Sequence, residues 1–113
     1  MKVIIAGSRL FVPTHNDVLL LDKFKNNITE VVSGCAKGGD AFGESWASWN
    51  KIPIKKFPAN WELYGKAAGH IRNSEMAEYA DGLIAFIINN SKGTSNMIKQ
   101  AKENNLWIKV IEK

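Results

Sequence analysis

Only one cysteine, Cys35, occurs in the 113 residues of this sequence. A lone thiol excludes an internal disulfide and a metal cluster built from several thiolates. The two histidines, His15 and His70, stand apart from other ligand-type residues, so we expect no metal site. The sequence contains no other signature of a bound group, and we therefore expect no cofactor.

Long hydrophobic runs are also missing. No apolar stretch approaches the roughly 18 residues that a membrane-spanning helix needs. The N-terminus, MKVIIAGSR, has no signal-peptide core. We therefore expect a cytoplasmic protein that does not enter a membrane. Charge of one sign is not concentrated either, because the net charge of +4 arises from lysines scattered at positions typical of solvated faces.

Short apolar runs alternate with helical patterns along the chain, which predicts an α/β fold. The predicted strands are residues 2–6, 30–33, 52–57, 82–88 and 106–111. Pro53 makes the third of these an edge strand. The predicted helices begin after the N-cap Thr14, cover 40–50 and about 68–79, and follow the loop at 89–94. In the second helix, Phe42, Trp46 and Trp49 are expected to face the core.

A chain of this length is enough for one domain with a real core and too short for two. We therefore predict a single domain, residues 1–113, with a five-stranded parallel sheet in the common order 3-2-1-4-5. Ligands bind such sheets outside the carboxyl ends of the strands, where the strand order reverses. The polar, glycine-bearing segments 7–9, 33–40 and 89–96 all lie at those ends, which indicates a ligand site.

The loop Gly34-Cys35-Ala36-Lys37-Gly38-Gly39-Asp40 joins a predicted strand to a predicted helix. It matches neither the Walker A pattern nor the dinucleotide fingerprint. Its glycines still let amides approach an anion, while Lys37 and the helix N-terminus add positive charge. A tight turn with Asp40 as N-cap explains the same residues without a ligand. Because a carboxylate repels phosphate, Asp40 either caps the helix or accepts hydrogen bonds from a ribose.

The loop Ser91-Lys92-Gly93-Thr94-Ser95-Asn96 repeats the theme, with a lysine, a glycine and hydroxyls that enter a helix. Without a ligand, Thr94 or Ser95 is simply the N-cap. Two such loops at one cleft favour phosphate binding, because one cap does not require the other. Arg9, directly after the first strand, would lie beside both loops. It can bind a phosphate or a carboxylate bidentately, and a surface salt bridge is the alternative.

The middle of the chain combines an aromatic side chain with hydrogen-bond donors. Trp61 follows Asn60 in a predicted loop and can stack on a base, while Arg72 and Asn73 can donate to it or to its ribose. In the alternative interpretation, Trp61 only covers the edge strand.

Five stretches together resemble the YspA-like branch of the SLOG superfamily: IIAGSRLF, VVSGCAKGGDAFGESWA, FPANWELYGKAAGHIRNSEM, ADGLIAF and KGTSNMIKQA. That superfamily is similar to Rossmann folds and includes lonely-guy phosphoribohydrolases, the DNA-processing protein A and sensors of nucleotides derived from NAD. The resemblance implies a three-layer Rossmann-like domain that forms a homo-oligomer. It also implies a nucleotide pocket built by Gly7-Ser8-Arg9, Gly34 to Asp40, Asn60-Trp61, Arg72-Asn73 and Gly93-Thr94.

The resemblance also limits the chemistry. The phosphoribohydrolase branch carries Pro-Gly-Gly-x-Gly-Thr-x-x-Glu, and its glutamate takes part in catalysis. Here Met97 stands at that position and cannot act as an acid or a base. We therefore predict a sensor or sequestering protein for a small nucleotide, either cyclic or derived from NAD or ADP-ribose. The alternatives are a nucleotide-processing hydrolase (an N-glycosidase or phosphohydrolase) acting through Asp40 or Glu44, and a binder of single-stranded nucleic acid.

Overall fold

The computed structural model describes residues 1–113 and contains one parallel sheet with the strand order β3-β2-β1-β4-β5. The strands are β1 (Lys2–Gly7), β2 (Glu30–Ser33), β3 (Ile54–Lys56), β4 (Gly82–Ile87) and β5 (Trp107–Glu112). Every neighbouring pair is parallel, and Ile4 of the central strand lies opposite both Val32 and Leu83. The predicted α/β class, strand order and edge position of β3 are confirmed.

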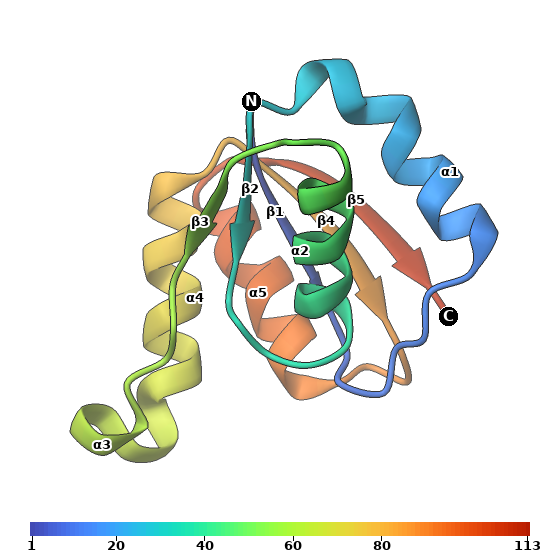
Figure 1. Ribbon diagram of the computed structural model, residues 1–113. Coiled ribbons are helices and arrows are strands. Elements are labelled where there is room, and N and C mark those ends of the chain that lie inside the picture. Colours follow the sequence, from blue (N-terminus) through green and yellow to red (C-terminus); the bar gives the residue numbers. More distant parts are fainter.

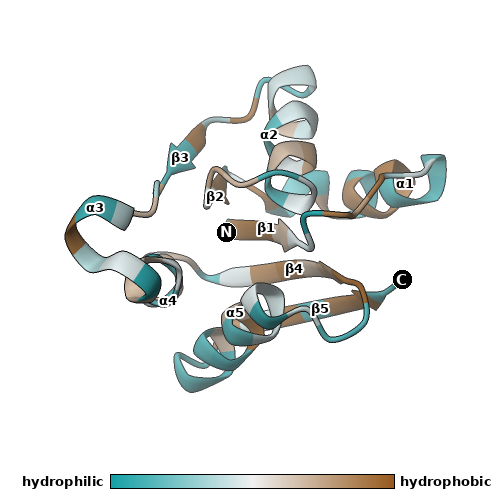
Figure 2. Cartoon of the chain, turned by 90° about the horizontal axis from the view of Figure 1, so that it is seen from below, coloured by the Kyte–Doolittle hydropathy of each residue, from teal (hydrophilic) through white to brown (hydrophobic).

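Helices cover both faces of this sheet. They are α1 (His15–Phe24), α2 (Gly39–Trp49), α3 (Trp61–Tyr64), α4 (Ala68–Tyr79) and α5 (Lys92–Glu103), with 3-10 turns η1 (Lys25–Asn27) and η2 (Gly65–Ala67). Helices α1 and α2 lie on one side of the sheet, and α4 and α5 lie on the other (Figure 2). Helix α3 projects from the body next to the start of α4 (Figure 1). None of the helices is long and apolar enough to cross a lipid bilayer.

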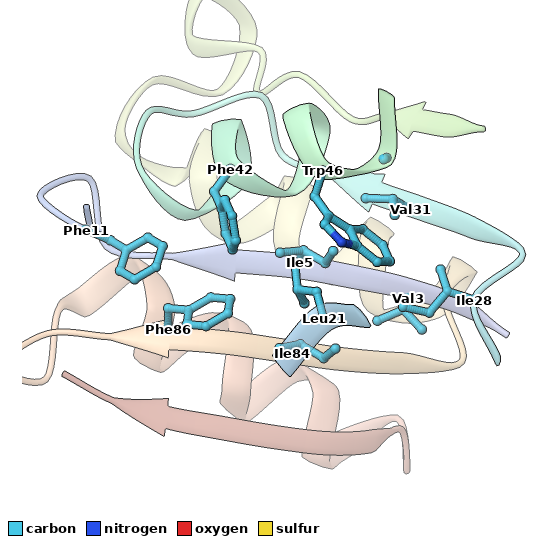
Figure 3. Packing of buried hydrophobic residues seen from close by; sticks show 11 residues of the cluster. Val3, Ile5, Phe11, Leu21, Ile28, Val31, Phe42, Trp46, Ile84 and Phe86 are labelled. Carbon is cyan, nitrogen blue, oxygen red and sulfur yellow. The ribbon is translucent and has the colours of Figure 1, made fainter. Parts of the chain in front are cut away.

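Each face of the sheet carries its own hydrophobic cluster, because side chains alternate along β1. Val3 and Ile5 pack with α1 and α2, whereas Ile4 packs with α4 and α5. On the first face, Trp46 lies fully buried beside Ile5 (Figure 3). The Phe11 ring stacks on Phe86 with the ring centroids 4.7 Å apart. This contact holds the loop after β1, which carries Arg9, against the core.

Some local predictions hold and others need correction. Helix α1 begins after Thr14 as predicted, since the Asp17 carboxylate accepts hydrogen bonds from the Thr14 N–H at 2.9 Å and from its hydroxyl at 3.0 Å. Trp46 is buried, but the prediction for Trp49 was wrong, because this side chain is 74% exposed. Gly43 and not Trp49 completes the inner face of α2: a Cβ on Gly43 would lie 2.7 Å from the Ile5 Cβ.

Two helix starts also differ from the prediction. Helix α5 begins at Lys92 with Ser91 as its N-cap, so neither Thr94 nor Ser95 has that role. Helix α3 lies within a segment predicted as loop. The Asn60 side chain caps it by accepting a hydrogen bond from the Leu63 N–H at 3.0 Å. An Asn followed by residues able to form one turn was the local signal for it.

Candidate functional site

A cavity of about 540 Å³ opens at the carboxyl edge of the sheet, beside the ends of β1 and β4. This is the place where the strand order reverses, as expected for ligand sites of such folds. The predicted site residues in its walls are Gly7, Ser8, Arg9, Asp40, Trp61, Arg72, Asn73, Gly93 and Thr94. The remaining ones, Gly34, Lys37, Gly38, Gly39, Asn60 and Ser95, do not line it. The parallel topology therefore brings four distant segments together around one space.

The start of α5 presents hydrogen-bond donors to this cavity. The Ser91 side chain makes no capping bond, and the first turn contains no acidic residue. The leading N–H groups of a helix have no partner within the helix, so these amides stay available to an anion. A Cβ on Gly93 would meet no atom within 4 Å, which shows that the space beside this turn is open.

Two hydroxyls strengthen the donor character of the same turn. Ser8 accepts a hydrogen bond from the Ile88 N–H at 3.0 Å and donates to the Ser91 oxygen at 2.9 Å. The hydrogen of Ser91 thus has no protein acceptor. Thr94 is 5% exposed, lines the cavity and forms no side-chain hydrogen bond with the protein. Both hydroxyls can donate to an atom inside the cavity.

Two glycines of the β2–α2 loop, Gly38 and Gly39, allow close packing of the backbone. A Cβ on Gly38 would lie 2.0 Å from the Ser8 carbonyl oxygen, and one on Gly39 would lie 2.2 Å from the Gly7 nitrogen. Their lack of side chains lets α2 pack directly against the end of β1. Lys37 is exposed and does not line the cavity. From this loop, only Ala36 and Asp40 reach the cavity.

Asp40 is a buried acid in a wall otherwise rich in donors. It is 6% exposed, and its Oδ2 accepts a hydrogen bond from the Ala36 N–H at 3.1 Å. Burial raises the pKa of Asp40, and neither the Ala36 N–H nor the nearby Arg72 guanidinium fully offsets that effect. The carboxylate therefore keeps unused hydrogen-bonding capacity at the cavity wall.

Arg72 and Asn73 join the two loops. The guanidinium of Arg72 donates to the Gly34 carbonyl, and its Nε donates to Asn73 Oδ1 at 3.0 Å. The amide of Asn73 donates to Asn96 Oδ1 at 3.0 Å and to the Gly93 carbonyl at 3.3 Å. These bonds hold the β2–α2 loop and the start of α5 in a fixed relation, so most of the donors predicted for a base or ribose serve the protein itself.

Trp61 and several cations complete the walls. Trp61 is 52% exposed, and its ring packs over the start of α4, where a Cβ on Gly69 would be 3.6 Å away. His70 lines the cavity, and Arg9 and Lys66 line it without forming a salt bridge. With Arg72 they outnumber the single acid, Asp40, which gives the cavity positive character.

Sequence reasoning missed four polar wall residues, Lys66, His70, Asn89 and Ser91. Lys66, His70 and Asn73 recur at the spacing of one helical face, which was the available signal for two of them. Ser91 was visible only as part of a polar loop. No group of three or more His, Cys, Asp or Glu side chains is arranged to hold a metal ion.

Comparisons with known proteins agree with this architecture. The gene 61 protein of Mycobacterium phage D29 is 36% identical over 80 residues, which cover 65% of this chain and 63% of the phage protein. The X-ray structure of DNA processing protein A (DprA) from Streptococcus pneumoniae has a TM-score of 0.56 at 17% identity. That match covers 96% of this chain and 58% of the DprA chain, so it shows a shared fold. The chain therefore spans less than two thirds of each relative.

A family model gives the assignment that the resemblance predicted. The model of the YAcAr family matches residues 1–64, from β1 through α3, which is more than half of the chain. The matched part includes Gly7, Arg9 and Asp40 of the cavity wall. On this evidence the chain belongs to the YspA, cpYpsA-related SLOG family.

Proposed function

We propose that this protein binds a nucleotide in the cavity, with a phosphate of the ligand at the start of α5. The Thr94 hydroxyl carries the proposal, because it belongs to a residue that is 5% exposed and lines the cavity, and it has no protein partner. No buried side-chain oxygen or nitrogen of the protein lacks a hydrogen-bond partner, so this hydroxyl is open to the cavity and can bond to a ligand there. A phosphate offers several strong acceptor oxygens. The Ser91 hydroxyl, the uncapped amides and the charge of Arg9 suit the same group.

The remaining walls suit the rest of a nucleotide. Trp61 offers a half-exposed aromatic face on which a base can stack. The volume of about 540 Å³ falls within the range of roughly 300–1,000 Å³ typical of small-molecule sites. Membership of a SLOG family and the fold shared with a DNA-processing protein support a function related to nucleotides or nucleic acids. We infer a sensor or sequestering protein for a cyclic nucleotide or one derived from NAD or ADP-ribose.

The first test is a thermal-shift screen of nucleotides, cyclic nucleotides, NAD and ADP-ribose, followed by calorimetric titration of every ligand that raises the melting temperature. Thr94→Val keeps the side-chain shape but removes the hydroxyl. We expect it to weaken binding by about tenfold or more, the worth of one hydrogen bond to a charged group. Its melting temperature without ligand should stay close to that of the wild type, because the hydroxyl bonds to no protein atom.

Matched controls separate a local effect from a general one. Ser95→Ala removes a hydroxyl of the same turn that does not line the cavity, and it should leave affinity unchanged. Likewise Arg9→Ala should weaken binding, whereas Lys37→Ala removes an exposed cation outside the wall and should not. Equal affinities for Thr94→Val, Arg9→Ala and the wild type would refute the phosphate site. Oligonucleotides in the same screen test the nucleic-acid alternative, whose affinity should fall steeply with salt.

Hydrolysis of a nucleotide is a second candidate, and one observation favours it. Asp40 places a carboxyl with a raised pKa in the cavity wall, as general acids and bases often do. Glu44 does not line the cavity; it accepts a hydrogen bond from Ser33 and pairs with Lys56 at 3.7 Å. Chromatography of nucleotides and NAD after long incubation with the protein tests this candidate. Unchanged substrate would eliminate it and leave binding as the function.

A further inference from the structure

Asp40 is the only acidic residue in the wall of the cavity, and one of its oxygens has no protein partner. Oδ2 accepts the Ala36 N–H, while no protein group donates to Oδ1. Arg72 lies close enough to lower the pKa of this carboxyl, but it donates to the Gly34 carbonyl and to Asn73. No buried side-chain oxygen or nitrogen of the protein lacks a hydrogen-bond partner, so Oδ1 is open to the cavity. A donor on the ligand can reach it there in place of water.

The chemistry of that donor follows from the charge of Asp40. A fully ionised phosphate group has no N–H or hydroxyl to offer, and a carboxylate repels it. A hydroxyl or an N–H group of the ligand must therefore meet Oδ1. The raised pKa of Asp40, which burial causes, fits a carboxylate whose donors are not all supplied by the protein.

The position of Asp40 relative to the phosphate site favours a sugar hydroxyl. Arg72 reaches the Gly34 carbonyl beside Asp40, and its neighbour Asn73 reaches the Gly93 carbonyl at the start of α5. This pair of adjacent residues thus spans from Asp40 to the turn where the phosphate is proposed. In a 5′-nucleotide the ribose follows the phosphate directly, and its 2′ and 3′ hydroxyls are donors. The base lies one group further from the phosphate, and Trp61 is the aromatic side chain of the cavity wall on which it can stack.

Resting on the proposed phosphate site, we propose that Asp40 accepts a hydrogen bond from the ribose 2′ hydroxyl of the ligand and makes the cavity selective for ribonucleotides over 2′-deoxyribonucleotides. A site that hydrogen-bonds a substrate hydroxyl rejects the analogue that lacks it, because the buried partner is then left unpaired. Asp40, whose carboxylate would repel a phosphate, thus determines the specificity of the cavity for the sugar.

Calorimetric titration with paired probes tests this inference. The pairs are adenosine and 2′-deoxyadenosine mono-, di- and triphosphates, together with ribose 5-phosphate and 2-deoxyribose 5-phosphate, which carry no base. We expect the wild-type protein to bind the ribose member roughly 10- to 100-fold more tightly, the worth of one hydrogen bond to a charged group. In Asp40→Asn, the amide oxygen can still accept the Ala36 N–H, while the amide nitrogen faces the cavity. The preference should then fall to about threefold or less.

Two further variants complete the design. Asp40→Leu removes both oxygens and should abolish the preference as well. Glu62→Gln removes an acid of the neighbouring helix α3 that does not line the cavity, so it should keep the wild-type ratio. Thermal unfolding of each variant verifies the fold. The wild-type ratio decides the ribose selectivity by itself, and a folded Asp40 variant decides whether Asp40 causes it.

Each unfavourable outcome of the titrations would overturn a different part of the proposal. Equal wild-type affinities within the pairs would overturn the ribose selectivity while leaving the phosphate site intact. A wild-type preference that persists in a folded Asp40→Leu variant, whose side chain neither donates nor accepts, would show that another residue recognises the sugar. Absence of binding by every probe, and by every ligand of the thermal-shift screen, would overturn the phosphate site and the ribose inference with it.

Discussion

Replacing a glycine by alanine at the start of α2 and at the start of α5 should have opposite effects on stability. At Gly39, a Cβ would lie 2.2 Å from the Gly7 nitrogen and 2.3 Å from its Cα. Those atoms belong to the central strand β1, which cannot move without disturbing both neighbouring strands. At Gly93, a Cβ would meet no atom within 4 Å. The two substitutions are chemically identical, so they isolate the role of each loop.

The expected magnitudes follow from these distances. Ordinary overpacking costs about 1–3 kcal/mol, and a clash with backbone atoms should reach or exceed the upper end of that range. Since a domain of this size unfolds with roughly 5–15 kcal/mol, Gly39→Ala removes a large share of the total. It should lower the melting temperature by about 10 °C or more, at about 4 °C per kcal/mol. Gly93→Ala should instead stabilise the protein by about 0.4–1 kcal/mol, because alanine favours the helix and restricts the unfolded chain.

Urea unfolding followed by tryptophan fluorescence measures both effects, because the fully buried Trp46 becomes exposed on unfolding. Titration with ligand gives a second measurement, in which Gly93→Ala should weaken binding since its methyl group enters the cavity. Wild-type stability of Gly39→Ala would refute the packing role of the first loop. The same result would mean that the β2–α2 loop can move away from β1 at little cost in free energy and could admit a ligand.

Two further predictions concern pH. Burial raises the pKa of Asp40, so ionisation of this carboxyl lowers the stability of the fold as pH rises through the folded-state pKa. In urea unfolding, Asp40→Asn should therefore be more stable than the wild type near pH 7 but not near pH 3. An equal difference in stability at both pH values would contradict this prediction. Burial also tends to raise the pKa of Asp17, but the Thr14 N–H and the Lys113 ammonium prevail and lower it. Ionised Asp17 therefore stabilises the fold above its unfolded pKa of about 3.9, and this contribution is lost as pH falls through the folded value. Lys113→Met should cost about 2 kcal/mol near pH 7 and much less near pH 2, so a cost independent of pH would show that the ion pair is not its origin.

Local chemistry was enough to predict the architecture. Helix α4 has the predicted bounds, Ala68–Tyr79. Helix α1 begins after Thr14 because the Asp17 carboxylate accepts hydrogen bonds from the N–H and the hydroxyl of Thr14. Continuous apolar runs identified the buried strands, and the handedness of crossovers left few possible orders for five of them. Once the sheet is parallel, all loops after its strands meet at one edge. The place of the cavity was therefore contained in the sequence.

The sequence by itself did not reveal which polar groups are free to act. Gly38 and Gly39 have the composition of a phosphate loop, yet they lie against β1. Arg72 and Asn73 have many donors, but they use most of them to join two loops.

Ser91 became a candidate only through its contact with Ser8, which is 83 residues away in the chain. Short-range patterns report on the backbone around a residue, because helix and strand formation depend on near neighbours. Whether a hydroxyl or carboxylate is satisfied depends on atoms that distant segments bring to it. The sequence therefore determined where the cavity would lie, and only the tertiary structure decided which of its groups, Thr94 and Asp40 above all, remain available to the proposed ligand.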